Sequence, residues 1–336
     1  LPTGMHLLSG GGGSGGEAWT LGIDRETGRL RSWVIGGFEL LHAPLEAAFW
    51  RPPTDNDLGT SKPTGTTVAW LALERGPVRL LNSSLEEVKW DGLESSALRW
   101  CATTEPIAAL HKEPPLVQTC YTVGQGGEVL VSQTLRRRTS PLPNLPRFGV
   151  RFALTGGMRE LEWLGRGPNE NYWDRKRGSR LGLHAAPILN MTVPYLRPQE
   201  NGHREEVSYA TVERTDGVKV LLVGLDPSQF GLSAHHFSDD DFGATNFLLS
   251  RHTSDLRPRN ETFLHVDRAQ QGVGGIDSWG SYETPMAQYT IPYETMSMSF
   301  GVAVSSPHTA EREKPHARAR RLQSWIQAVA GAAAQG

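Results

Sequence analysis

The stretch WLGRGPNENYWDRKRG at residues 163–178 sets aromatic and charged residues around a Gly-Arg-Gly-Pro run. Glycine loses conformational entropy in a regular element, and proline has no N–H group to donate to a neighbouring strand. The run therefore predicts a short strand at 161–164 that ends in a rigid turn at 165–171. The residues after the turn are expected to form an ordered loop.

This loop has the composition of a structural anchor. Its tryptophan and tyrosine rings can pack onto the body of the protein, and Asp174 is expected to pair with Arg175 or Arg177. Direct contact with a ligand is the alternative, because aromatic rings and a few charged groups also line binding sites. The residues alone favour the structural interpretation and leave the other open.

Short stretches of alternating apolar and polar residues make up most of the remaining chain. Residues 296–302 place Met, Phe and Val at every second position, which is the period of a strand with one buried face. Ala18–Ile23 and Leu30–Ile35 flank a turn at 25–28 and predict a hairpin. Further strands are expected at 98–104, 128–135, 150–154, 218–224 and 262–267. Such strands, separated by Gly/Pro turns, favour an all-β, antiparallel sandwich.

The composition changes at both ends of this strand-rich region. Residues 1–17 contain a glycine-rich run and are expected to be flexible, residues 18–306 to form the β-sandwich domain, and residues 307–336 to form a tail. In the tail, Leu322 and Ile326 belong to an apolar face with helical spacing, which predicts a short amphipathic C-terminal helix. This helix is expected either to dock loosely on the domain or to bind a partner.

The charge balance excludes some classes of partner. The chain has 336 residues, with 34 Lys+Arg against 36 Asp+Glu, so no nucleic-acid-binding surface is expected. No run of about 18 apolar residues occurs, so no membrane span is expected. The first residues lack the basic start and apolar core of a secretory signal. We therefore expect a cytoplasmic location.

Cys101 and Cys120 fall on neighbouring predicted strands. They could pair in an oxidising compartment, but two cysteines make neither a disulfide scaffold nor a zinc site, so free thiols are expected. The acidic turn at 54–57 lacks the later bidentate glutamate of a calcium loop. No metal site is expected in this chain.

Four aromatic-rich motifs follow one another along the sequence. They are FWRPPTDNDLG (49–59), WLGRGPNENYWDRKRG (163–178), VPYLRPQENGHREEV (193–207) and LHVDRAQQGVGGIDSW (264–279). In this order they resemble the β-galactosidase small chain, the C-terminal domain of long family-2 glycoside hydrolases. The resemblance extends over most of the chain.

The resemblance implies a large, twisted antiparallel β-supersandwich of the galactose mutarotase-like type. It also implies that this domain completes the sugar-binding pocket for hydrolysis of terminal β-D-galactosides in lactose catabolism. The catalytic glutamates belong to a TIM-barrel domain, with the expected Mg and Na ions, and this chain shows no βα alternation of that kind. The implied partners are a galactoside, a TIM-barrel large chain or domain, and further subunits of a hetero- or homo-oligomer. No catalytic residue or cofactor is expected here, and the chain should be inactive alone.

The resemblance further selects the substrate-binding residues Asn56, Asp57, Gly59, Asp277 and Trp279. Gly59 matches the start of a mobile loop that closes over the sugar, here Thr60–Thr66. Trp279 matches a tryptophan that stacks on the sugar at the acceptor subsite, whereas the residues alone would place it in the core. Glycines just before Asp277 would permit a backbone bend, which the Asp277 carboxylate can hold by hydrogen bonds.

Two other functions remain open from the residues. An aldose 1-epimerase opens a pyranose ring with a histidine acid and a carboxylate base. His203 and Glu205, which are near each other in the sequence, could supply such a pair. Rival histidines are His184, His235, His236, His252 and His265. A non-catalytic carbohydrate-binding module is the third possibility.

Overall fold

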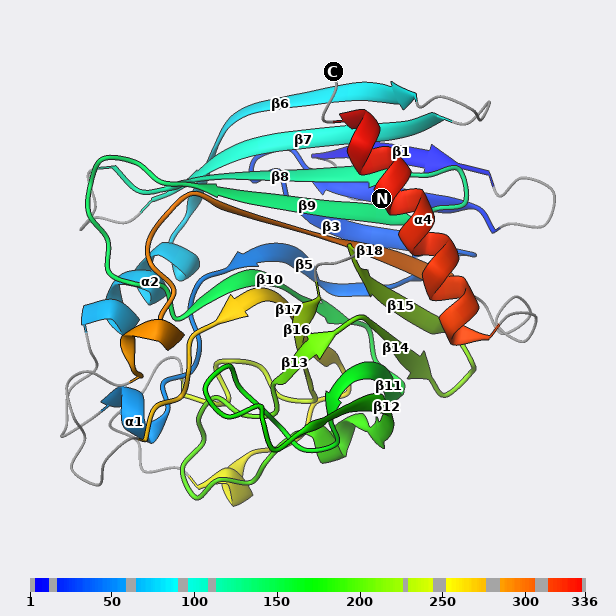
Figure 1. The fold of residues 1–336 in the computed structure, drawn as a ribbon. Helices are drawn as coiled ribbons and strands as arrows, with labels where there is room; N and C mark the ends of the chain where they lie inside the picture. Colours follow the sequence, from blue (N-terminus) through cyan, green and yellow to red (C-terminus); the bar gives the residue numbers. More distant parts are fainter. Residues whose placement is uncertain are drawn as a thin grey trace.

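The computed structural model describes residues 4–11, 17–58, 65–89, 96–107, 113–225, 229–243, 252–275, 285–305 and 314–333. Within these ranges the protein consists of three antiparallel sheets and a few helices, one of which lies along the outside of the largest sheet (Figure 1). The predicted all-β class with a C-terminal helix is confirmed. Among the described residues, no helix has the length and apolar character needed to cross a bilayer.

The largest sheet has nine strands in the order β12-β11-β14-β15-β18-β9-β8-β7-β6. Its strands are β6 (Val78–Lys89), β7 (Ser96–Pro106), β8 (Leu116–Val123), β9 (Val129–Arg136), β11 (Met158–Gly167), β12 (Arg180–Pro187), β14 (Tyr209–Arg214), β15 (Lys219–Gly224) and β18 (Met296–Ser305). Strand β18 comes from late in the chain and inserts between β9 and β15, so it joins the two halves of the sheet.

A second sheet has five strands in the order β13-β16-β17-β10-β5. Its strands are β5 (Leu41–Ala48), β10 (Arg147–Leu154), β13 (Arg204–Val207), β16 (Phe230–His235) and β17 (Thr262–Gln270). The third sheet contains β1 (Met5–Gly10), β2 (Trp19–Asp24), β3 (Leu30–Ile35) and β4 (Phe38–Glu39). Strands β2 and β3 form the predicted hairpin, and β1 pairs with β2 although it lies in the segment expected to be flexible.

Helices connect and cover these sheets. They are α1 (Asp55–Leu58), α2 (Gly65–Arg75) and α4 (Pro315–Ala333), with 3-10 turns η1 (Ile188–Met191), η2 (Thr253–Asp255) and η3 (Ala287–Tyr289). The Trp70 ring of α2 is buried between Phe49 and Tyr293.

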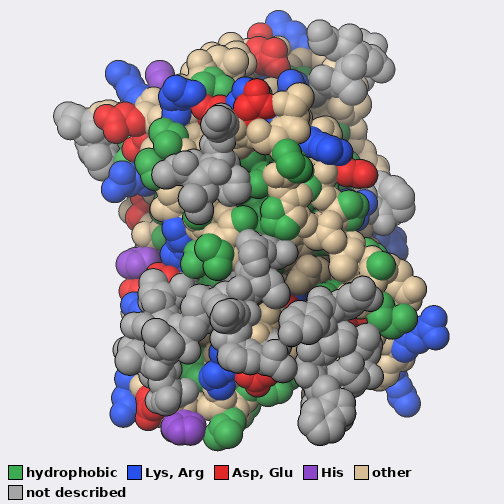
Figure 2. Space-filling model, turned by 90° about the vertical axis from the view of Figure 1, so that its left-hand side faces the viewer, with side chains coloured by type: hydrophobic (Ala, Val, Ile, Leu, Met, Phe, Trp, Pro, Cys, Tyr) green, Lys and Arg blue, Asp and Glu red, His purple; other side chains and the backbone are tan. Residues whose placement is uncertain are grey.

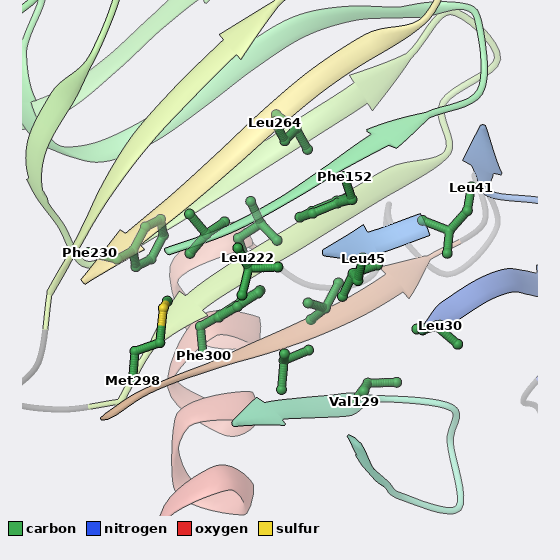
Figure 3. Packing of buried hydrophobic residues seen from close by; sticks show 14 of the residues in the cluster. Leu30, Leu41, Leu45, Val129, Phe152, Leu222, Phe230, Leu264, Met298 and Phe300 are labelled. Atoms are coloured by element: carbon green, nitrogen blue, oxygen red, sulfur yellow. The ribbon is translucent and has the colours of Figure 1, made fainter. Parts of the chain in front are cut away.

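The main core lies between the nine-stranded and five-stranded sheets (Figure 3). Phe152, Leu264 and Phe230 from the smaller sheet point toward Leu222 and Phe300 from the larger one. These side chains occupy alternate positions of their strands, because successive residues of a strand face opposite sides. The strands expected at 150–154, 218–224, 262–267 and 296–302 therefore contribute to this layer, whereas β16 was not expected from the sequence.

Strand β15 is apolar on both faces because each face has a cover. Val220 and Leu222 belong to the core between the sheets, whereas Leu221 and Val223 pack against α4 on the outside. On α4, Ile326 is fully buried, and a Cβ at Gly301 would lie 2.3 Å from its Cδ1 atom. The C-terminal helix therefore docks closely on its own sheet.

Two local predictions were wrong. Strand β11 continues through Gly167 rather than ending at residue 164. Glycine at 165 allows β13 to pack closely against β11, because a Cβ at this position would lie only 2.9–3.1 Å from Val207 and the Glu206 carbonyl. Cys101 and Cys120 form a disulfide rather than free thiols, since the register of β7 and β8 places them directly opposite each other.

Candidate functional site

The segment Gln271–Gly275 leaves the end of β17, and side chains from distant parts of the chain bind its backbone. Arg51 donates from Nη1 to the Gln271 carbonyl at 2.5 Å and from Nη2 to the Gly272 carbonyl at 2.9 Å. Asn56 donates from Nδ2 to the Val273 carbonyl at 2.8 Å. We call these contacts the backbone clamp. The first and fourth sequence motifs meet at this clamp.

Asp57 orients the clamp. Its carboxylate accepts from Arg51 Nε at 3.2 Å and Nη2 at 3.0 Å, and both side chains are buried. Asp57 also accepts from the Thr54 backbone N–H at 2.9 Å, while its own N–H donates to Thr54 Oγ1 at 3.1 Å. This reciprocal pair caps α1 and fixes Asp57. Asn56 and Asp57, two of the predicted substrate-binding residues, therefore bind groups of the protein's own backbone.

The second motif also binds this segment. Asp174 accepts from the Gly274 N–H at 2.8 Å, and Arg175 Nη2 donates to the Gly274 carbonyl at 3.1 Å. The expected pairing of Asp174 with Arg175 or Arg177 is thus replaced by joint binding to Gly274. Gly274 and Gly275 have φ values of +72° and +83°, a region that favours glycine. The predicted glycine bend is confirmed.

The third motif supports α1 and the loop of the second. Gln199 donates to the Asp55 carboxylate at 2.9 Å and accepts from its N–H at 3.0 Å. Glu170 accepts from the Gly202 N–H at 2.7 Å and from the Tyr195 hydroxyl. All four motifs, which are far apart in the sequence, therefore form one connected cluster.

A buried ionic layer lies on the face of the five-stranded sheet that points away from the core. Arg147 is fully buried and contacts Glu200 and Asp267, each at 3.2 Å, and its Nη1 lies 2.9 Å from His265 Nδ1. Burial would raise the pKa of Glu200, but the Arg147 guanidinium holds that pKa below its ordinary value. Burial raises the pKa of Asp267 despite the same neighbour.

The ionic layer also fixes the backbone of the first motif. Glu74 of α2 accepts from the N–H groups of Phe49 at 2.7 Å and Trp50 at 2.8 Å, and its other oxygen lies 2.7 Å from Arg151. Sequence reasoning missed Arg147, Arg51 and Glu74. A signal existed for the arginines, since each interrupts an apolar or aromatic run that otherwise indicates burial.

Three of the five predicted substrate-binding residues, Gly59, Asp277 and Trp279, lie outside the described residues, as do residues 60–64 of the expected lid. Of the two described ones, Asp57 precedes Gly59 by two residues, and the clamped segment likewise ends two residues before Asp277. Figure 2 views the side on which α1 and α2 lie, where the described acidic and basic side chains are interspersed.

The histidines have separate environments. His203 is fully buried, with Nε2 3.1 Å from Glu205 and its ring stacked on Tyr172. His265 contacts Asp239, and His235 contacts Thr192 and the Asn201 carbonyl. The others serve local structure: His184 packs on Trp163, His236 contacts the Glu261 carbonyl, and His252 caps η2. In the described ranges, no three His, Cys, Asp or Glu side chains gather as metal ligands would.

Comparison with known proteins assigns this β-sandwich and its motif cluster to a class of glycosidase domains. The family model described as beta galactosidase small chain matches residues 15–302. A β-galactosidase of Priestia megaterium is 31% identical over 277 residues, which cover 82% of this chain and 25% of the relative. A β-galactosidase of Vibrio cholerae is 29% identical over 293 residues, covering 85% and 26%.

The chain therefore belongs to the β-galactosidase small-chain family. It spans about a quarter of the length of these curated relatives. Among solved structures, a galactose mutarotase related enzyme from Lactobacillus acidophilus overlaps 90% of this chain and 98% of its own, with 9% identity and a TM-score of 0.49.

Proposed function

We propose that this chain forms one wall of the galactoside pocket of a β-galactosidase, while another domain or chain supplies the catalytic carboxylates. The backbone clamp is the observation that carries this proposal. It fixes the segment before Asp277 and Trp279 to the segment before Gly59. A rigid base of this kind suits residues that must meet a substrate in one geometry.

The carboxylates that the structure describes are poorly suited to glycoside hydrolysis by themselves. That reaction needs a carboxylic acid with a raised pKa beside a second, ionised carboxylate. Among the described carboxyl groups with a resolved shift, only Asp267 has a raised pKa, and its side chain is fully buried against Arg147. Asp57, Asp174 and Glu200 are engaged by protein donors. These observations support catalytic residues outside this chain.

The Mg and Na ions expected in such an enzyme belong, in this proposal, to the catalytic domain. Asp57, the acid that orients the clamp, already accepts from Arg51 and from the Thr54 backbone N–H. Its carboxylate is therefore poorly available as a ligand for Mg²⁺ or Na⁺. The same proposal makes the galactoside and a TIM-barrel partner the binding partners, with a cytoplasmic role in lactose breakdown.

Hydrolysis of a chromogenic β-galactoside tests this division of labour. The chain is assayed alone, and then mixed with a relative from which the matching quarter has been deleted. We expect turnover only in the mixture. Turnover by the chain alone, at a rate comparable to that of the mixture, would contradict the proposal.

The geometry gives less support to an aldose 1-epimerase. Such an enzyme needs an acid and a base that reach different oxygens of one sugar. His203 Nε2 is held by Glu205 at 3.1 Å, and Nδ1 faces Ser233 at 3.4 Å and Asp267 at 3.7 Å, so both ring nitrogens are engaged within the protein. Polarimetry on fresh α-galactose tests this alternative directly.

A further inference from the structure

A cavity of about 610 Å³ opens at the ends of β13, β16 and β17. This volume lies within the range of small-molecule sites. Its floor is buried and its rim is exposed, so it is accessible from solvent. His203, Phe230 and Gln270 belong to the floor, and Trp173, Gln229 and Arg268 to the rim.

This cavity is separate from the backbone clamp. Arg51, Asn56 and Asp57 do not line it. The two are linked through the chain, because Gln270 of the floor directly precedes Gln271 of the clamp. They are also linked through Trp173, whose ring meets Tyr289 edge to face at 5.9 Å, while the Tyr289 carbonyl accepts from the Gly272 N–H at 2.9 Å. The cavity therefore lies beside the proposed pocket wall and has its own set of side chains.

The polar floor of the cavity is held rigidly. The His203 ring lies between Tyr172, at a centroid distance of 5.5 Å, and Gly231. A Cβ at Gly231 would lie 2.3 Å from His203 Cε1, so the ring needs a glycine at that position. Because Glu205 binds His203 Nε2 at 3.1 Å, its carboxylate is fixed at the cavity wall. Rigid, oriented polar groups lower the entropic cost of binding a ligand.

The charges in the cavity balance one another. Lys176 lies 3.5 Å from Glu205 and 2.9 Å from Glu206, and these two carboxylates offset Lys176 and Arg268. A cavity with this balance does not select a strongly charged ligand. Its carboxylate, amide and guanidinium groups instead offer both acceptors and donors, beside the apolar surfaces of Trp173 and Phe230.

We infer that this cavity is a second carbohydrate-binding site, which takes a neutral monosaccharide or disaccharide in the small-chain domain itself. Vicinal hydroxyl groups both donate and accept, as the Glu205, Gln229 and Arg268 side chains require, and the apolar face of a sugar ring can pack on Trp173. Burial would raise the pKa of Glu205, yet its contact with His203 holds that pKa low, so it remains an acceptor at neutral pH. The site needs no catalytic partner and stands independently of the proposed function.

Calorimetry on the isolated chain tests the site with galactose, lactose and, as an anionic probe, galacturonate. We expect saturable binding of a neutral sugar with a Kd of about 1 mM. Glu205→Gln and Arg268→Ala should each weaken binding at least fivefold, whereas Glu213→Gln, which changes a carboxylate on β14 away from the cavity, should leave it unchanged. Thermal unfolding of every variant confirms that it is folded.

Three outcomes would overturn the inference. They are the absence of saturable binding by the wild-type chain, binding that Trp279→Ala abolishes while Glu205→Gln and Arg268→Ala leave it intact, and a preference for galacturonate that is lost in Arg268→Ala. The second outcome would move the sugar to the proposed pocket wall, and the third would change the class of ligand. None of these results depends on hydrolysis, so failure of this inference is distinguishable from failure of the proposed function.

Discussion

The outer faces of the two large sheets are each buried in part, but by opposite chemistry. On the nine-stranded sheet, α4 covers β15 and β18, where Leu322, Ile326 and Val329 meet apolar strand residues. The five-stranded sheet is covered by loops, and between them lies the ionic layer around Arg147 and Arg151. One layer consists of apolar contacts and the other of ion pairs and hydrogen bonds.

This difference reflects what each layer must do. Apolar contacts are non-directional, so they hold a helix on a sheet without fixing individual backbone groups. Ion pairs and hydrogen bonds are directional, and those formed by Glu74, Arg51 and Asn56 end on backbone groups of the candidate site. We infer that the ionic layer sets loop geometry at a cost in desolvation, whereas the apolar layer contributes stability.

Removing Arg147 should have the largest effect. Arg147→Met leaves Asp267 and Glu200 buried without their cation, which should lower the free energy of unfolding by about 3–5 kcal/mol. Urea denaturation measures the change. Arg159→Met, an exposed arginine on β11, is the matched control and should change stability by less than about 0.5 kcal/mol. Equal small effects for both variants would contradict the ionic layer's role.

Truncating the apolar layer should have a similar or slightly smaller effect. Ile326→Ala removes a fully buried side chain and leaves a cavity against β18, so the free energy of unfolding should fall by about 2–5 kcal/mol. Gln327→Ala, at an exposed position of the same helix, should have almost no effect. An Ile326→Ala protein as stable as the wild type would mean that α4 docks loosely after all.

The free energy of unfolding should also depend on pH through a histidine on the ionic side of the molecule, whereas the apolar layer on α4 should give no such dependence. Burial lowers the pKa of His235 to about 4, from an ordinary value of 6.5. Between pH 6.5 and 4, His235 is protonated in the unfolded chain but not in the folded one. The free energy of unfolding therefore falls by about 3 kcal/mol as the pH is lowered through this range. Above pH 6.5 this contribution is constant.

Denaturation at several pH values checks the sign and size of this term. In His235→Gln, an amide can keep the contacts with Thr192 and the Asn201 carbonyl without titrating. Its stability should depend less steeply on pH between 6.5 and 4 than that of the wild type. Parallel curves for the two proteins would rule out His235 as a source of the dependence.

A smaller effect on stability is expected from Asn56. Asn56→Ala removes one hydrogen bond to the Val273 carbonyl, which should cost about 1 kcal/mol in unfolding free energy. In the mixture with a truncated relative, the same change should raise KM for a galactoside severalfold, since it loosens the segment before Asp277. Ile326→Ala provides the contrast, because it should lower stability more and leave KM unaltered.

Much of the fold could be predicted from the sequence, because its apolar layer follows simple periods. Alternation at 296–302 and 150–154 located strands of both sheets, and the helical spacing of Leu322 and Ile326 located α4. The glycines at 165 and 167 led to the wrong prediction of a turn, because they lie inside strand β11 and allow close packing there. The disulfide was missed because it depends on strand register, which composition does not give.

The candidate site was only partly predictable. The four motifs identified the segments that converge, but not which side chain binds which backbone group. Asp174 and Arg175 illustrate the limit. Their opposite charges at neighbouring positions suggested that they pair with each other, whereas both bind Gly274, which belongs to a distant motif. Contacts across about 100 residues of sequence depend on the complete fold, so no local pattern specifies them.

The most direct test of the pocket-wall proposal compares two tryptophan substitutions in the mixture with a truncated relative. Trp279→Ala should raise KM for a β-galactoside about tenfold and leave the stability of the small-chain domain nearly unchanged. Trp325→Ala, which removes a partly buried ring from α4, should lower stability and leave KM the same. An unchanged KM in Trp279→Ala would contradict a wall of the sugar pocket formed by this chain.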